Sequence, residues 1–404
     1  MQIGTDGFFH LTYCTNIHPG ERWDEVFRNL DVYTRALKTR LSPDEPFGIG
    51  LRLSDLASRE ILEGDELPRF KDWLDANGMY VFTMNGFPYG GFHRQIVKDH
   101  VYAPDWRTQE RVDYTVRLAH ILAELLPEGM EGGISTSPIS YKPWLATGER
   151  HEALELGAIH LEQVTAELVR LRERTDKLIH IDIEPEPDCL IENLAETIHF
   201  FNDVLLPKSG NMLIVDDLQD HIRVCYDTCH FSVEYEQPDV VFEQFAENGI
   251  KVGKVQISSA LRIPIPQSEE GRHEVVELLD PFAEHTYLHQ VIERRPDGTL
   301  GHYSDLPRAV YNILDAEAEE WRIHYHVPIF VDHYGKLGST QYDITATLDE
   351  VIPQRICPHF EIETYTWDVL PPELKVDITE SISREYEWVL EQFDKRMREG
   401  KEGQ

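Results

Sequence analysis

The stretch IHIDIEPEP, at positions 179–187, decides the fold that this sequence predicts. Its three isoleucines alternate along a strand, so they point to one side, and the histidine, aspartate and glutamate between them point to the other. Parallel strands are usually buried on both sides, which makes a polar face unusual. In a closed barrel that face points inward, where a metal or polar partners must offset the cost of a buried carboxylate. Pro185 ends the strand, so we expect Glu184 at the carboxyl-terminal rim, as a metal ligand or as a salt-bridged structural residue.

Strand-like apolar runs alternate with amphipathic stretches along the rest of the chain. Helical spacing of apolar residues is clear at 21–41, 107–126 and 151–174. Strands that alternate with helices predict a parallel sheet, and eight such units close into a (β/α)8 TIM barrel. The runs that we interpret as strands are 10–16, 47–53, 79–85, 132–137, 178–184, 222–227, 251–257, 322–329 and 359–365.

These nine runs exceed the eight of a barrel by one, so either 322–329 or a neighbouring run is accessory. Residues 287–304 contain a PDG turn and predict a hairpin insertion in the C-terminal third. Residues 378–397 predict a C-terminal helix, and 398–404 a frayed polar tail. No Pro-, Ser- or Gly-rich linker divides the chain, and we therefore expect one domain over 1–404.

The charge and the cysteines narrow the class of protein. A formal net charge of −35 repels phosphate backbones and anionic lipid, so we expect neither nucleic-acid binding nor membrane insertion. The five cysteines form no CxxC pair, which argues against a disulfide framework. The first residues show no signal-peptide pattern, and no run of about 18 apolar residues is present. We expect a cytoplasmic protein.

Two polar groups follow the predicted strands 222–227 and 251–257. In CYDTCH, Asp227 ends the strand and His230 follows three residues later, so both can face one centre. Oxygen and imidazole ligands together suit zinc, manganese or iron. A plain helix cap is the alternative for this pair. In KVQISSA, Gln256 offers a weaker amide ligand, and a hydrogen-bonded rim glutamine is an equal alternative.

Two further segments carry histidines and glutamates. In RIHYHVPIF, His324 and His326 share one face and can reach one pocket, where they are candidates for binding a substrate, as is His230. His326 is also a candidate metal ligand, as is His230. In HFEIETYTW, Glu361 and Glu363 share one face, and Glu363 lies nearer the rim, so we select it as the rim carboxylate.

The segment that follows the strand 79–85 predicts a substrate-binding loop. It contains Asn85, Phe87, Tyr89, His93 and Lys98. Aromatic rings can pack on the apolar face of a sugar- or indole-like ligand, while amide, imidazole and amine groups bond its edge. A well-packed Gly/Pro loop without a ligand is the alternative. Loops at this end of a barrel usually carry the site, which favours the binding interpretation.

Glu184, Asp227 and Glu363 are three acids, each near the carboxyl end of a predicted strand. Such ends meet at one mouth of a barrel, and anions gathered there require a cation. We therefore predict a divalent metal ion, Mn²⁺, Zn²⁺ or Mg²⁺. With the metal on a hydroxy-carbonyl group, Glu184 and Glu363 could move a proton between adjacent carbons as general base and acid.

The pattern resembles the xylose isomerase-like TIM barrel superfamily. Its members carry a Glu on strand five, Asp with His three residues later on strand six, a His or Gln on strand seven and a Glu on strand eight. The matching positions here are Glu184, Asp227 with His230, Gln256 and Glu363. The resemblance implies that these residues hold the metal. Gln256 stands where ketose epimerases have histidine, which leaves open whether His326 takes that ligand position.

The sequence resembles still more the EboE family of metabolite-traffic proteins in that superfamily. The stretches that carry this resemblance are LTYCTNIHPGE (11–21), NGFPYGGFHRQIVKDHVYAPDW (85–106), ISTSPISYK (134–142), YDTCH (226–230), HYHVPIF (324–330) and EIETYTWDVLP (361–371). The resemblance implies handling of a small metabolite, other proteins of ebo gene clusters as partners, and a homo-oligomer as one arrangement.

Two functions follow from these observations, and a third ranks low. The first is a metal-dependent isomerase or epimerase of a small polyhydroxylated or ring-bearing metabolite. The second is a non-catalytic carrier or scaffold that binds a metabolite on the same barrel. The third, an endonuclease IV-like hydrolase, ranks low because the net charge opposes DNA binding.

Overall fold

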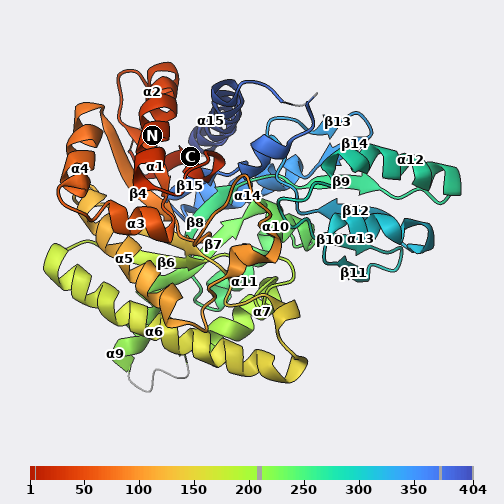
Figure 1. The fold of residues 1–404 in the computed structure, drawn as a ribbon, viewed down its shortest axis with the longest axis horizontal. Coiled ribbons are helices and arrows are strands. Elements are labelled where there is room, and N and C mark those ends of the chain that lie inside the picture. The colour runs from red at the N-terminus through yellow and green to blue at the C-terminus, as the bar shows by residue number, and fades with distance from the viewer. Residues whose placement is uncertain (5, 207–211, 373–374, 403–404) are drawn as a thin grey trace.

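A computed structural model describes residues 1–4, 6–206, 212–372 and 375–402. Within this part of the chain, eight parallel strands line the centre of the molecule, surrounded by helices (Figure 1). The strands are β2 (Phe9–Tyr13), β3 (Phe47–Arg52), β4 (Met79–Asn85), β5 (Gly132–Thr136), β6 (Ile179–Ile183), β7 (Ile222–Asp227), β8 (Val252–Ile257) and β15 (His359–Ile362). The predicted (β/α)8 fold class is confirmed.

The order of the strands shows how the barrel closes. The sheet runs β1-β2-β15-β8-β7-β6-β5-β4-β3, where the short β1 (Gln2–Ile3) is an antiparallel addition to β2. An isolated parallel bridge between Cys14, just after β2, and Gly50 on β3 joins the two ends. The carboxyl ends of all eight strands therefore meet at one mouth.

The helices form the outer layer. They are α1 (Trp23–Asn29), α2 (Arg35–Leu41), α3 (Asp55–Glu60), α4 (Glu66–Ala76), α5 (Gln109–Leu125), α6 (Arg150–Thr175), α7 (Leu194–His199), α9 (Met212–His221), α10 (Thr228–Val233), α11 (Pro238–Glu247), α14 (Gln341–Gln354) and α15 (Ile378–Glu402). The helix predicted at 21–41 contains a π-helical turn, Leu30–Thr34, between α1 and α2. No helix in the described residues is long and apolar enough to cross a membrane.

The C-terminal helix α15 is present where the sequence predicts it. Phe393 of this helix packs edge-on against Phe9 of β2 and Phe360 of β15, which fixes the helix to the barrel. The helix continues to Glu402, into the segment predicted as a frayed tail, and positions 403–404 lie outside the described residues.

An insertion between β8 and α14 forms a second sheet, which extends from one side of the barrel (Figure 1). The antiparallel order is β11-β10-β12-β9-β14-β13. The strands are β9 (Leu261–Pro264), β10 (Val291–Arg294), β11 (Leu300–Tyr303), β12 (Glu320–Ile323), β13 (His333–Tyr334) and β14 (Leu337–Ser339), with helices α12 (Glu269–Leu279) and α13 (Leu306–Tyr311). Trp321 lies in the separate hydrophobic cluster of this insertion.

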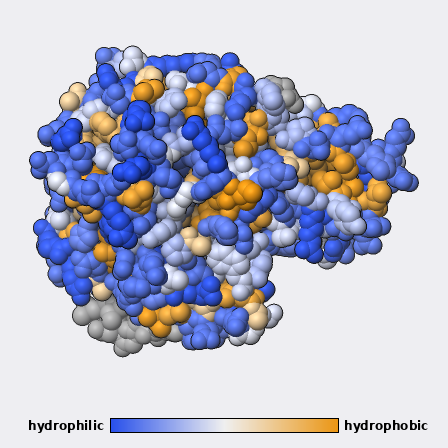
Figure 2. Space-filling model, viewed as in Figure 1, coloured by the Kyte–Doolittle hydropathy of each residue, from blue (hydrophilic) through white to orange (hydrophobic). Residues whose placement is uncertain are grey.

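The insertion accounts for the ninth strand-like run. The predicted hairpin at 287–304 is β10–β11, but it is one part of a segment that spans positions 261–339. The run 322–329 is the accessory one, because only its start pairs, within β12. Hydrophilic residues cover most of the face shown in Figure 2, as the net charge of −35 leads us to expect.

The barrel interior is polar where β6 faces it. His180 Nδ1 lies 2.6 Å from Asp182 Oδ1, and neither side chain is exposed. Burial raises the pKa of Asp182 to about 8. The glycines on neighbouring strands provide the space: a Cβ on Gly253 would lie 1.9 Å from Asp182 Oδ1, and one on Gly133 would lie 2.3 Å from Oδ2. The alternation in β6 thus places its polar residues inside the barrel.

Candidate metal centre at the barrel mouth

Three carboxylates from different strands meet at the mouth of the barrel. Glu184 directly follows β6, Asp227 ends β7 and Glu363 directly follows β15. One oxygen from each lies within 4.8 Å of the other two, and all three residues are buried. The structure therefore brings together the acids that the sequence analysis selected from positions up to 179 residues apart.

Each of two carboxylates keeps one oxygen without a partner. Asp227 caps α10: its Oδ1 accepts hydrogen bonds from the backbone N–H groups of Cys229 and His230 and from the Ser258 hydroxyl, at 2.7, 3.0 and 2.6 Å. Asp227 Oδ2 and Glu184 Oε2 are buried and have no hydrogen-bond partner among the described residues. Buried carboxylate oxygens without partners are costly, and a bound cation would satisfy them.

Glu363 is held differently, by side-chain amides. Its Oε1 accepts from Asn16 and Asn85 at 2.7 and 3.0 Å, and its Oε2 accepts from the amide nitrogen of Gln256. The Gln256 oxygen in turn accepts from the Cys225 thiol at 2.8 Å. Gln256 thus contacts a carboxylate of the cluster rather than pointing away from it.

Burial and mutual repulsion act on the acids of this cluster. Burial, together with the neighbouring Asp227 and Glu361, raises the pKa of Glu363 to about 8. Burial, with Glu363 and Asp227 beside it, raises the pKa of Glu184 well above its usual range. A divalent cation reverses both effects, because it stabilises the charged carboxylates.

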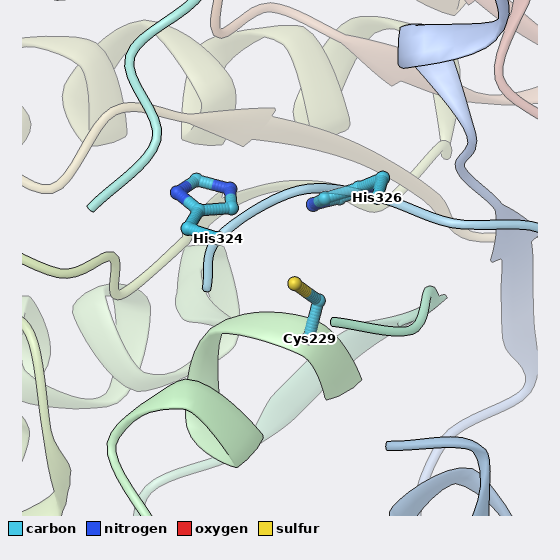
Figure 3. A group of neighbouring side chains, drawn as sticks. All are labelled: Cys229, His324 and His326. Carbon is cyan, nitrogen blue, oxygen red and sulfur yellow. The ribbon is translucent and has the colours of Figure 1, made fainter. Parts of the chain in front are cut away.

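Histidines cover the other side of the mouth. His230 lies on α10, and His324 and His326 lie on the extended segment that follows β12 of the insertion. Figure 3 shows His324 and His326 side by side with the Cys229 sulfur directed toward them, and ligand atoms of these three residues lie within 4.8 Å of one another. Burial lowers the pKa of His326 to about 4 and that of His324 well below its usual range, so both imidazoles are neutral.

Carboxylates and histidines border one cavity, which the loop after β4 covers. Of the residues selected by sequence, its wall includes Asn85, Phe87, Lys98, Glu184, His230, His324 and Glu363. Lys98 also forms an ion pair with Asp305 of the insertion at 2.7 Å, and the backbone N–H of Val97 donates to the Thr286 carbonyl at 2.8 Å. The loop and the insertion therefore close over the mouth together.

The structure places Tyr89, His93 and His326 outside this cavity wall, whose described residues do not include them. Tyr89 packs edge-on against Tyr114 of α5. His93 accepts from the Tyr287 hydroxyl at 3.0 Å and donates to the Asn16 carbonyl, so both ring nitrogens are engaged. These two side chains hold the loop. His326 lies behind the wall, where its Nδ1 donates to the Glu363 carbonyl at 2.9 Å.

The sequence analysis did not select several residues of the wall. Glu186 lies two residues after Glu184 in the same IEPEP stretch, so the alternation already contained a signal for it. Asn16 lies just after the end of β2, and this position at a strand end is the signal that could have identified it as a residue of the cavity wall. No local pattern points to Tyr102, which lies on the loop after β4 and stacks on Tyr141. None points to Tyr287 either, because the folding of the insertion over the barrel brings it there.

Solved structures with this architecture include sugar epimerases and metal-binding proteins. An L-ribulose 3-epimerase is 11% identical over 97% of each chain, with a TM-score of 0.53. A xylose isomerase-like TIM barrel protein from Mycobacterium smegmatis in complex with magnesium is 11% identical over 98% of this chain and 99% of that one, with a TM-score of 0.52. The IolI protein with a bound zinc atom is 10% identical over 96% and 99%, with a TM-score of 0.50.

These similarities establish the fold. The chain has the xylose isomerase-like TIM barrel fold, and its structural neighbours are proteins of that type. No protein-family model matches the sequence, and no curated protein matches it either. What the site does must therefore be argued from its own residues.

Proposed function

We propose that this protein is a divalent-metal-dependent isomerase or epimerase of a small polyhydroxylated or ring-bearing metabolite. The observation that carries the proposal is the meeting of Glu184, Asp227 and Glu363, with two buried oxygens that have no partner in the described residues. Structural neighbours that are named as an epimerase and as magnesium- or zinc-bound proteins support the class.

The residues present fit a divalent cation. Glu184, Asp227 and Glu363 supply oxygen ligands, and either the Gln256 oxygen or His326 Nε2, which is buried and unpartnered among the described residues, completes the set. Mn²⁺, Zn²⁺ and Mg²⁺ all accept such donors. When bound, the cation supplies Lewis-acid polarisation of neighbouring hydroxyl and carbonyl oxygens.

The two glutamates carry the proton. Glu184 follows β6, Glu363 follows β15 and both line the cavity, so a substrate carbon bound there is accessible to both. One carboxylate removes a proton from the carbon next to a carbonyl, and the other returns a proton to the neighbouring carbon or to the opposite face. The amides of Asn16 and Asn85 orient the Glu363 carboxylate.

The cavity wall recognises the substrate. Phe87 offers an apolar face for a ring, and Asn85, Lys98, His230 and His324 offer hydrogen bonds at its edge. Tyr89 and His93 contribute indirectly, because they fix the loop that carries Phe87. We expect His326 to act from behind the wall, on the metal rather than on the substrate.

A non-catalytic carrier is the second candidate. Glu363 already accepts hydrogen bonds from three amides, so it is satisfied without a cation, and a barrel without metal could still bind a metabolite. The EboE-like stretches support this role, with other ebo-cluster proteins as partners, a cytoplasmic location and a homo-oligomeric state as parts of the same proposal.

Metal content and proton exchange test the proposal together. The full chain is loaded with Mn²⁺ and incubated with a panel of ketoses in D₂O, and we expect deuterium to enter one substrate at the carbon beside the carbonyl. Glu184→Gln and Glu363→Gln should each reduce the exchange at least about 100-fold. Glu131→Gln, in the partly buried pair with Arg223 at 3.2 Å before β5, is the matched control and should retain it. A metal-free protein that binds the metabolite without exchange would establish the carrier.

A further inference from the structure

At the mouth of the barrel, a ring nitrogen of His230 points toward a ring nitrogen of His324. The Nε2 atoms of His230 and His324 lie 3.1 Å apart, and both side chains are buried. Such a contact is favourable only if something positive lies on or between the nitrogens, because a hydrogen bond needs one donor.

The partners of the other ring nitrogens show where the protons are. His230 Nδ1 lies 2.9 Å from the Pro185 carbonyl, which can only accept, so this nitrogen carries the proton. His324 Nδ1 lies 2.8 Å from the Gln290 amide oxygen. The Gln290 nitrogen donates to the Pro187 carbonyl at 3.0 Å, which fixes the orientation of that amide. A neutral imidazole has one N–H, so both facing Nε2 atoms present lone pairs.

This geometry matches that of two ligands of one metal ion. With metal–nitrogen bonds of about 2.0–2.1 Å and a tetrahedral angle, ligand nitrogens lie roughly 3.3 Å apart. An Nδ1–H held by a carbonyl or amide oxygen is also how metal-binding histidines are usually oriented. His230 and His324 have this arrangement independently of each other, on α10 and on the insertion.

Glu186 lies beside the two histidines. One carboxylate oxygen of Glu186 and one ring nitrogen each of His230 and His324 lie within 4.8 Å of one another. Glu186 is buried, and its Oε1 lies 3.5 Å from His324 Nδ1. The Tyr102 hydroxyl donates to Glu186 Oε1 at 2.7 Å and so orients the carboxylate. Pro185 and Pro187 on either side restrict the backbone that carries it.

We propose that His230, His324 and Glu186 bind a second divalent cation, beside the one assigned to Glu184, Asp227 and Glu363. The two sets share no residue, and Glu184 and Glu363 of the first set line the same cavity as all three residues of the second. Asp227 is close to both sets, because ligand atoms of Asp227, His230 and His326 also lie within 4.8 Å of one another. A set with two imidazoles favours Zn²⁺ over Mg²⁺.

The insertion completes this second site. His324 follows β12 and Gln290 precedes β10, whereas the three carboxylates Glu184, Asp227 and Glu363 of the first site come from the ends of the barrel strands. The second site goes beyond the proposed reaction, since it concerns a further cation and stands whether the first site isomerises sugars or not.

Counting bound zinc tests the inference. The full chain is stripped with a chelator, dialysed against Zn²⁺ and measured by mass spectrometry of the metal. We expect two equivalents in the wild type and one in His324→Asn and in Glu186→Gln. His160→Asn removes a buried imidazole that contacts the Trp106 carbonyl instead, and should keep two. Circular dichroism checks that each variant folds.

A second readout separates the two sites. With Co²⁺ in place of Zn²⁺, the visible absorption of the nitrogen-rich site should disappear in His324→Asn and persist in Glu363→Gln. One equivalent in the wild type, with no loss in His324→Asn or Glu186→Gln, would overturn the second site and leave the proposed function standing. Two equivalents without substrate exchange would overturn the proposed function and leave the second site standing.

Discussion

Lys254 and Glu361 form an ion pair inside the barrel, with 2.6 Å between Nζ and Oε2 and neither side chain exposed. Lys254 lies two residues before Gln256 on β8, and Glu361 two residues before Glu363 on β15, so the pair lies in the layer beneath the acidic cluster. Burial opposes the charge of Lys254, but Glu361 outweighs it and the pKa of Lys254 is raised. The candidate metal centre therefore rests on a charged layer.

Lys254→Met should destabilise the protein strongly. The variant leaves Glu361 buried without its cation, and such a loss typically costs about 3–5 kcal/mol. Urea unfolding measures this loss in the free energy of unfolding. Lys251→Met, which breaks a half-exposed pair with Asp220, is the control and should cost less than about 1 kcal/mol. Equal effects of the two variants would contradict a buried, charged pair.

Gly50→Ala should destabilise the same layer by steric contact. A Cβ at Gly50 would lie 1.9 Å from Glu361 Oε1 and 2.8 Å from the Tyr13 carbonyl oxygen. The first atom belongs to a carboxylate whose other oxygen, Oε2, is held by Lys254, and the second is backbone, so neither moves freely. We expect a cost of about 1–3 kcal/mol. At Gly148 no atom lies within 4 Å, so Gly148→Ala should change the free energy of unfolding by less than about 0.5 kcal/mol. Thermal unfolding of both variants decides.

The barrel and its acidic cluster were predictable because their signals are local. Strand alternation in β6 assigns the faces of Ile181 and Asp182, and parallel strands bring their carboxyl ends together, so Glu184 and Glu363 had to meet if the barrel closed. The insertion was predicted only in part, as a hairpin. Its strands are two to four residues long, too short for a periodic signal.

Local sequence patterns could not place the side chains whose positions depend on contacts with distant parts of the chain. Tyr89 was expected to face a ligand, yet it packs on α5 because the loop turns its Phe87 inward instead. The residue pattern of 322–329 predicts a strand. Only the fold of the insertion shows that His324 reaches the mouth of the barrel from outside the barrel sheet.

The free energy of unfolding should decrease as the pH rises from about 5 to about 7, partly because of Glu385. This side chain is 1% exposed on α15, and burial raises its pKa to about 7, against the hydrogen bonds from the Thr364 hydroxyl and the Ile329 backbone N–H. Below its unfolded pKa of 4.5 the group is neutral in both states and costs nothing. As the pH rises to about 7 the unfolded state loses its proton first, so the folded state is destabilised by about 3 kcal/mol.

Glu385→Gln removes this titration and keeps an oxygen that can accept both hydrogen bonds. The variant should be more stable than the wild type at pH 8, by up to about 3 kcal/mol, and the difference should vanish near pH 4.5. Urea unfolding at several pH values measures the difference. Glu391→Gln, at an exposed position of the same helix, should show no such trend. A pH-independent difference would mean that Glu385 titrates alike in both states.

Gln256→His should strengthen binding of the first cation. In the present chain the Gln256 amide donates to Glu363 Oε2 and so occupies an oxygen that the cation needs. An imidazole at this position offers a better donor to Zn²⁺ or Mn²⁺ than an amide oxygen does, and it frees Glu363 from the amide.

We therefore expect the dissociation constant for Mn²⁺ to fall by about tenfold or more, measured by calorimetry on the metal-stripped protein. Gln237→His adds an imidazole at an exposed position before α11 and controls for surface binding. An unchanged constant would place Gln256 outside the coordination sphere and leave His326, whose Nε2 is buried and free of hydrogen bonds to the described residues, as the fourth ligand. In that case His326→Asn, rather than Gln256→Ala, should weaken binding, because the last ligand would then come from the insertion and not from the seventh strand of the barrel.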